Sequence, residues 1–138
     1  MVAIGIELIT NPSLLFLDEP TSGLDSFMAL KVSKLLRNLA VNYNKTIVAT
    51  IHQPSSEAFA LFDRLILICD GNIVYQGLAN DVVPYFKQRL GFTFSSFSNP
   101  ADNFMRVMHV NYPKKEKDLM LIEHLARNYQ INLASIVD

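Results

Sequence analysis

The sequence of 138 residues lacks several features that mark particular classes of protein. It contains one cysteine, Cys69, so no disulfide can form within the chain, and this thiol is predicted to be a small buried side chain in a reducing compartment. No apolar run approaches the roughly 20 residues that span a bilayer. The first residues show no basic segment followed by an apolar one, which disfavours a secretory signal.

The chain also lacks a strong charge of either sign. Its formal net charge is −1, and lysine and arginine form no long run, so we expect no nucleic acid to bind through a basic surface. Hydrophobic residues make up 50% of the sequence and charged residues 18%, which excludes a disordered chain. The composition predicts one folded domain with a substantial core.

Residues 14–25 join an apolar run to two adjacent carboxylates, Asp18 and Glu19. Pro20 follows and cannot continue a central strand. The unbroken apolar run predicts a strand buried on both faces, as in a parallel sheet covered by helices. The two acids then lie at the carboxyl end of that strand, where open α/β sheets bind ligands. One carboxylate can hold Mg²⁺ while the other activates a water molecule.

A second strand is predicted at residues 46–51, which are β-branched and apolar. Between the two strands, apolar residues from Met28 to Leu39 recur at helical spacing, and Asp25 or Ser26 can cap that helix. Strand, helix and strand form a right-handed unit with parallel strands. His52 follows the second strand directly and is therefore expected at the same sheet edge as the two carboxylates.

Further elements are indicated along the chain. An uncapped helical pattern covers residues 1–10, so the chain is expected to begin inside an element. A hairpin is predicted from two short strands around the turn signal Asp70-Gly71. Helices are predicted near residues 56–62, 80–90, 102–110 and 119–129.

Three stretches together resemble one family. LLFLDEPTSGLDS resembles the Walker B strand and D-loop of ATP-binding-cassette (ABC) ATPases, and TIHQPSSEAFALFDRLILICDGNIVYQG resembles the switch-histidine segment of their G subfamily. That subfamily comprises half-transporters and includes the insect eye-pigment transporters. The NPAD stretch at residues 99–102 resembles a segment that follows the switch in those proteins. The resemblance covers residues 2–112.

The resemblance implies that Glu19 and His52 are catalytic and that Asp18 binds the metal and the cofactor. Asp18 matches the acid that helps to hold Mg²⁺, usually through water, and Glu19 matches the general base. His52 matches the switch residue that contacts the γ-phosphate of ATP. ATP and Mg²⁺ are therefore the expected cofactors.

The resemblance also implies a nucleotide-contacting turn and a partner. Ser22, Gly23 and Asp25 match the D-loop, which in the family reaches the second cassette of a dimer. A second ABC cassette and the transmembrane domain of a half-transporter are thus the expected partners.

The fold implied is α/β, a P-loop NTPase-like parallel-sheet core. It is expected to be truncated, because the sequence contains neither G-x-x-x-x-G-K-[ST] nor the Leu-Ser-Gly-Gly signature. Residues 1–112 are expected to form the C-terminal part of a nucleotide-binding domain, and residues 113–138 a linker toward a transmembrane domain. A chain with these absences is predicted to be poorly stable and unable to hydrolyse ATP alone.

The implied function is part of the ATP-hydrolysing domain of a transporter that exports a hydrophobic substrate. The implied location is the cytoplasmic side of a membrane. The alternative is a non-catalytic chain that binds an intact ABC cassette, or a fragmentary gene product. Soluble ABC-type ATPases of DNA repair share the Asp-Glu and His elements, but the HQP triplet and the absence of a basic surface disfavour them.

Overall fold

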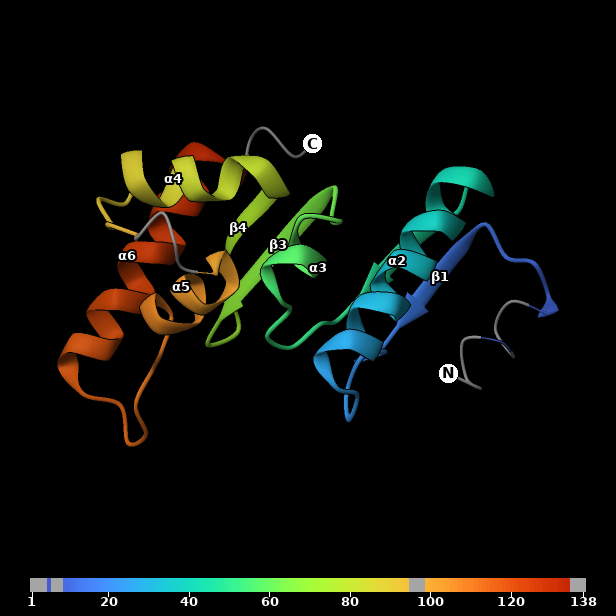
Figure 1. The fold of residues 1–138 in the computed structure, drawn as a ribbon. Helices are drawn as coiled ribbons and strands as arrows, with labels where there is room; N and C mark the ends of the chain where they lie inside the picture. Colours follow the sequence, from blue (N-terminus) through green and yellow to red (C-terminus); the bar gives the residue numbers. More distant parts are fainter. Residues whose placement is uncertain (1–4, 6–8, 95–98, 135–138) are drawn as a thin grey trace. The chain divides into compact units, whose positions relative to one another are not determined.

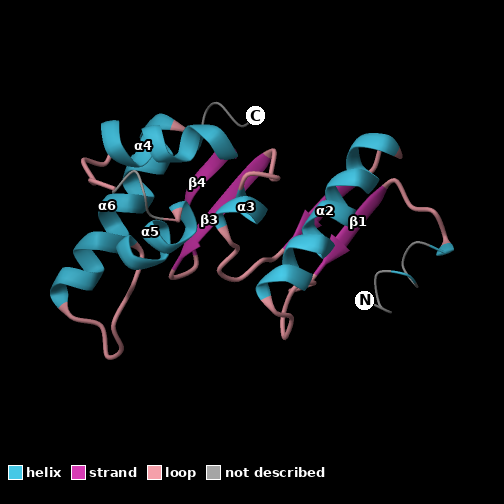
Figure 2. Ribbon diagram, viewed as in Figure 1, coloured by secondary structure: helices cyan, strands magenta, loops and turns pink. Residues whose placement is uncertain are grey.

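The computed structural model describes residues 5, 9–94 and 99–134. The chain divides into two compact units, Met1–Leu61 and Phe62–Asp138. Figure 1 follows the chain from blue to red, and Figure 2 distinguishes its helices from its strands. Each unit has its own sheet and is described by itself.

The first unit is a parallel strand pair with one long helix. Strands β1 (Leu14–Leu17) and β2 (Thr46–Ala49) pair in parallel, and helix α2 (Ser26–Asn42) connects them. The short helix α3 (Ser56–Phe59) follows β2. The predicted strand–helix–strand unit is confirmed, although β2 ends two residues earlier than the sequence pattern indicated.

Helix α2 covers one face of this pair. Val32 and Leu36 on α2 are buried, and Leu17 and Ile47 of the strands pack against them. On the other face Phe16 is 72% exposed and Val48 45%. The prediction that these strands are buried on both faces is therefore wrong. Side chains of a strand alternate between faces, and α2 packs against only one of them.

The second unit combines a hairpin with helices. Its elements are β3 (Arg64–Cys69), β4 (Asn72–Leu78), the 3₁₀ turn η1 (Ala79–Asp81), α4 (Val82–Gln88), α5 (Pro100–Val107) and α6 (Glu116–Asn132). The two strands pair antiparallel around Asp70 and Gly71, whose φ angles are +49° and +79°. A type I′ two-residue hairpin loop requires positive φ at both turn residues, so the Asp-Gly signal located this turn correctly.

Aromatic side chains form the core of the second unit. Phe86 and Phe104 are 0% and 1% exposed, and their ring centroids lie 5.1 Å apart. Phe94 adds an edge-on contact to Phe104 at 5.6 Å. Val74 and Tyr75 of β4 are buried, and α6 packs against this strand. The helix predicted near residues 119–129 is confirmed as α6.

The described strands form two separate two-stranded sheets, one parallel and one antiparallel. The predicted parallel-sheet core is therefore wrong for the described chain, because β3 pairs with its sequence neighbour and not with β1 or β2. The predicted helix at residues 1–10 lies largely outside the described residues. None of the described helices is both long enough and apolar enough to cross a membrane.

Candidate functional site at the end of the parallel strands

A threonine connects the ends of the two parallel strands. The register pairs Leu17 with Ala49, so the residues that follow them, Asp18 and Thr50, lie side by side. The Thr50 hydroxyl donates to Oδ1 of Asp18 at 2.5 Å and accepts from the backbone N–H of Glu19 at 2.8 Å. One hydroxyl thus fixes the carboxylate of Asp18 and the backbone of Glu19 at the same edge.

The backbone adopts left-handed angles at this edge. Glu19 has a φ of +44°, and Gln53, directly after His52, has a φ of +45°. Residues with a Cβ adopt such angles at a cost of about 1–3 kcal/mol, and they concentrate at functional sites. The unusual backbone conformation therefore occurs at one predicted site residue, Glu19, and directly after another, His52.

The turn between β1 and α2 holds the other predicted residues. The Ser22 N–H donates to the Glu19 carbonyl at 3.0 Å, and Gly23 has a φ of +71°, which disfavours any other residue there. Oδ1 of Asp25 accepts from the N–H of Met28 at 2.8 Å. Asp25 is therefore the N-cap of α2, one of the two caps that the sequence indicated.

His52 lies in a different part of the same unit. It lines a small cavity of about 130 Å³ together with Thr21 and Leu24 of the turn, Ser33 of α2, and Ser55. Asp18 and Glu19 are not among the residues that line this cavity. The structure thus joins Asp18 and Glu19 through Thr50, and it brings His52 next to the turn.

Thr50 is the residue that sequence reasoning missed. It lies within an apolar run, so the sequence pattern predicted only a strand residue, a position where β-branched side chains are common. The signal that could have found it was the pairing of two parallel strands, which places the residue after Ala49 beside the residue after Leu17. A hydroxyl beside a carboxylate at a sheet edge is a polar arrangement that periodicity does not report.

The chemistry of this edge suits a hydrated hard cation. Asp18, Glu19 and Thr50 are all exposed and offer carboxylate and hydroxyl oxygens, the atoms that Mg²⁺ prefers. Within the described part of the chain, no group of three or more His, Cys, Asp and Glu side chains is placed to hold a metal directly. The carboxylate and hydroxyl oxygens at this edge are of the kind that can hold Mg²⁺ through its water ligands.

The second unit has a polar cluster of its own at the hairpin turn. Asp70 accepts hydrogen bonds from the Lys114 ammonium and the Tyr112 hydroxyl, each at 2.6 Å. These bonds, with Lys114 the stronger contributor, hold the pKa of Asp70 below its ordinary value. The cluster ties the segment before α6 to the turn between β3 and β4.

Comparisons with known proteins place the chain in a family. Residues 52–133, more than half of the chain, match the family described as ABC-2 type transporter. The matched stretch begins at His52, so Asp18 and Glu19 lie before it.

Individual relatives are similar over most of the chain. It is 49% identical over 111 residues to ABC transporter G family member 13 of Arabidopsis thaliana, covering 80% of this chain and 16% of that protein. It is 39% identical over 122 residues to ATP-binding cassette sub-family G member 8 of Rattus norvegicus, covering 88% of this chain and 17% of that protein. The chain thus spans about a sixth of the length of these relatives.

These matches correct the predicted fold class and support the predicted subfamily. The family that matches is a transporter family and not the P-loop ATPase cassette, so the predicted P-loop NTPase-like core is wrong. Short apolar runs specify strands but not the number of neighbours in their sheet, and the observed fold is a small α/β arrangement with two sheets. The relatives carry the G-family name. The chain therefore belongs to the ABC-2 type transporter family, where it is similar to members of the G family of ABC transporters.

Proposed function

We propose that this chain is part of an ABC transporter and supplies residues that hydrolyse ATP to drive export of a hydrophobic substrate. The relatives are named as an ABC transporter and an ATP-binding cassette protein, so transport and ATP binding are the activities of those proteins. The observation that carries the proposal for this chain is the Asp18–Thr50–Glu19 hydrogen-bond link at one sheet edge. It holds the carboxylate of Asp18 and the backbone of Glu19 at the same edge, and both residues are exposed.

The roles of the residues follow from their chemistry. Asp18 would hold Mg²⁺ through water, since Thr50 already occupies one of its carboxylate oxygens. The Glu19 backbone is fixed by Thr50, which leaves its carboxylate free to accept a proton from an attacking water. His52 would donate a hydrogen bond to a phosphate oxygen. When bound, Mg²⁺ would neutralise charge that develops on the phosphates.

The partners are proposed on the same basis. The five glycines of the sequence form no phosphate-binding loop, so the phosphates of ATP would be held by another part of the transporter. The turn that contains Ser22, Gly23 and Asp25 would contact the nucleotide together with a second ABC subunit. The chain would then lie on the cytoplasmic side of a membrane, next to a transmembrane domain.

The test replaces the matched segment of the Arabidopsis relative with this chain and measures ATP hydrolysis by the reconstituted transporter. The variant Glu19→Gln keeps the shape of the side chain and removes the base. We expect its turnover to fall by about 100-fold or more, the usual contribution of a general base. Thr50→Val is expected to lower turnover less, because it removes only the group that positions Asp18 and Glu19.

Glu116→Gln is the matched control. Glu116 is an exposed carboxylate at the start of α6 in the second unit, and its loss should leave turnover unchanged. Equal activity of Glu19→Gln and the unsubstituted chimera would overturn the proposal. That result would favour the alternative, in which the chain is a non-catalytic partner of an intact ABC cassette.

A further inference from the structure

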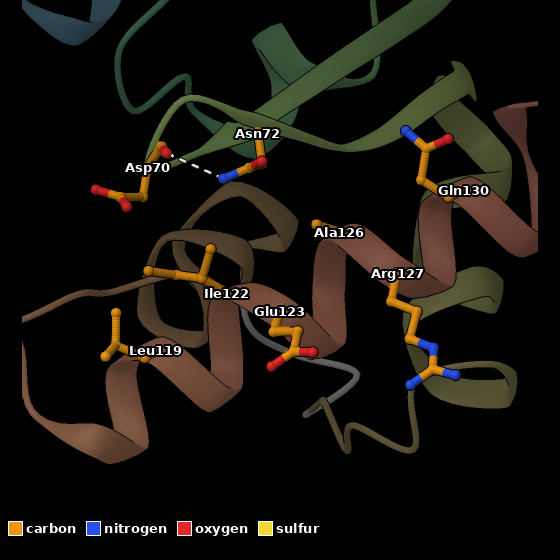
Figure 3. Close-up of a pocket in the computed structure, with 8 residues that line it drawn as sticks. All are labelled: Asp70, Asn72, Leu119, Ile122, Glu123, Ala126, Arg127 and Gln130. Atoms are coloured by element: carbon orange, nitrogen blue, oxygen red, sulfur yellow. Dashed lines mark hydrogen bonds between the residues drawn. The ribbon is translucent and has the colours of Figure 1, made fainter.

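A groove of about 650 Å³ lies in the second unit between the hairpin turn and α6. Asp70 and Asn72 line it from the hairpin, and α6 supplies the remaining lining residues, as Figure 3 shows. The α6 residues are Leu119, Ile122, Glu123, Ala126, Arg127 and Gln130. They recur at intervals of three and four, so they form one continuous face of the helix.

The polar side chains along this face have no partners in the described part of the chain. Glu123 and Arg127 are exposed and form no ion pair there, and Gln130 makes no hydrogen bond. An apolar side chain of the lining is also exposed, since Leu119 is 54% accessible. The groove therefore offers both unpaired charge and uncovered apolar surface.

An open groove of this kind favours a macromolecule over a small ligand. Sites for small molecules bury most of the ligand surface, whereas here one wall is formed by exposed side chains of a single helix. A helix that lies along such a groove can cover the apolar residues and pair with the charges.

We propose that the occupant is α6 of a second copy of this chain, packed antiparallel. In an antiparallel pair whose two-fold axis crosses the groove at the height of residue 125, Glu123 of each copy lies at the height of Arg127 of the other. The two opposite charges of one helix thus complement those of its copy, as the identical surfaces of a two-fold interface must.

The hairpin completes this arrangement. The symmetry brings Gln130 of the second copy to the end of the groove where Asp70 and Asn72 lie. Asn72 donates to the Asp70 backbone carbonyl at 3.1 Å, which leaves its side-chain oxygen able to accept from the Gln130 amide. Each copy contributes the same set of groups, so the contact is made twice.

The surface is small, and the dimer is correspondingly weak. Stable interfaces bury about 1,200–2,000 Å² in total, and one helix pair with a hairpin edge provides less. We expect a dissociation constant on the order of 0.1 mM. This contact uses no residue of the turn between β1 and α2, so it is separate from the nucleotide-dependent pairing proposed above.

The test is sedimentation of the purified chain at concentrations from about 10 μM to about 1 mM, a range that brackets the expected dissociation constant. The unsubstituted chain should shift from monomer to dimer. Glu123→Arg and Arg127→Glu should each weaken association about tenfold or more, because each places like charges opposite one another. The double variant with both substitutions should restore association, since it exchanges the two signs.

Lys34→Glu on the exposed face of α2 is the matched control and should leave association unchanged. A second measurement locates the contact: Ala126→Cys lies near the two-fold axis and should form a disulfide-linked dimer on oxidation, whereas Ser56→Cys on α3 should not. Cys69 is buried and should not interfere. A chain that stays monomeric at 1 mM, or a dimer that is indifferent to both charge reversals, would overturn the proposal.

Discussion

The two units of this chain bury their residues very differently. In the first unit, α2 covers one face of a two-stranded sheet, and the other face exposes Phe16 and Val48. In the second unit, aromatic rings fill a core in which Phe86 and Phe104 have almost no exposed surface. Since burial of apolar surface is the main favourable contribution to folding, the second unit should hold most of the stability.

The predicted chemistry lies in the less buried unit. Asp18, Glu19 and His52 all follow strand ends there, and their backbone includes left-handed angles that the core of the second unit does not require. A site with exposed polar groups and strained backbone contributes little to stability. The comparison teaches that the residues expected to act and the residues that stabilise the fold are largely different sets, in different parts of the chain.

The largest expected effect comes from removing a ring of the aromatic core. Phe104→Ala should lower the free energy of unfolding of the second unit by about 3–5 kcal/mol, because Phe104 is 1% exposed and contacts Phe86 and Phe94. Urea unfolding measures the loss of unfolding free energy. Hydrogen exchange of peptides from each unit shows which unit is destabilised.

Phe16→Ala provides the control in the first unit. Phe16 is 72% exposed, so the same change of side chain should cost less than about 0.5 kcal/mol. Comparable losses for the two variants would contradict the comparison between the units, because they would mean that the exposed face of β1 is covered.

The second effect is an alkaline loss of stability that should be confined to the second unit. Burial, reinforced by the nearby Asp81 carboxylate, raises the pKa of Tyr75 to about 12 from 10.0. Because the folded-state pKa is raised, this contribution is fully present below pH 10 and is lost as the pH rises toward 12. The loss should reach at most about 3 kcal/mol.

Thermal unfolding between pH 9 and pH 12 tests this expectation. Tyr75→Phe should remove this part of the pH dependence, and at neutral pH it should cost about 1 kcal/mol through the lost hydrogen bond to the Leu78 carbonyl. An unchanged alkaline profile in Tyr75→Phe would show that another group is responsible.

The sequence predicted local structure better than it predicted the sheets. The spacing of apolar residues located α2 and α6, and Asp70-Gly71 located the hairpin, because these signals depend on neighbours along the chain. The apolar run of β1 was interpreted as a strand buried on both faces. That interpretation failed because burial depends on which elements pack against the strand, and a run of four residues carries no such information.

The candidate site shows the same division. Parallel pairing allowed Asp18 and Glu19 to be placed correctly at the end of β1, and His52 just beyond β2. The hydrogen bonds of Thr50 could not be predicted, since they depend on the register between strands whose paired residues are 32 apart in the sequence, and on the rotamer of one side chain. The cavity beside His52 likewise depends on how the turn and α2 pack together.

The smallest expected effect concerns Asp25, for which the sequence suggested two roles. Its carboxylate caps α2 through the Met28 N–H, so Asp25→Ala should destabilise the first unit by about 0.5–2 kcal/mol. Asn caps helices about as well as Asp, and Asp25→Asn should therefore leave the unfolding free energy nearly unchanged. Hydrogen exchange in the first turn of α2 measures both variants.

The asparagine variant then separates the two roles, because it keeps the cap and removes the negative charge. If Asp25 also contacts a nucleotide across a subunit boundary, Asp25→Asn should lower ATP hydrolysis by the chimeric transporter while α2 keeps its protection. Normal hydrolysis by Asp25→Asn would limit Asp25 to the cap. In that case the Asp25 side chain would serve only the fold, through its one hydrogen bond to the Met28 N–H.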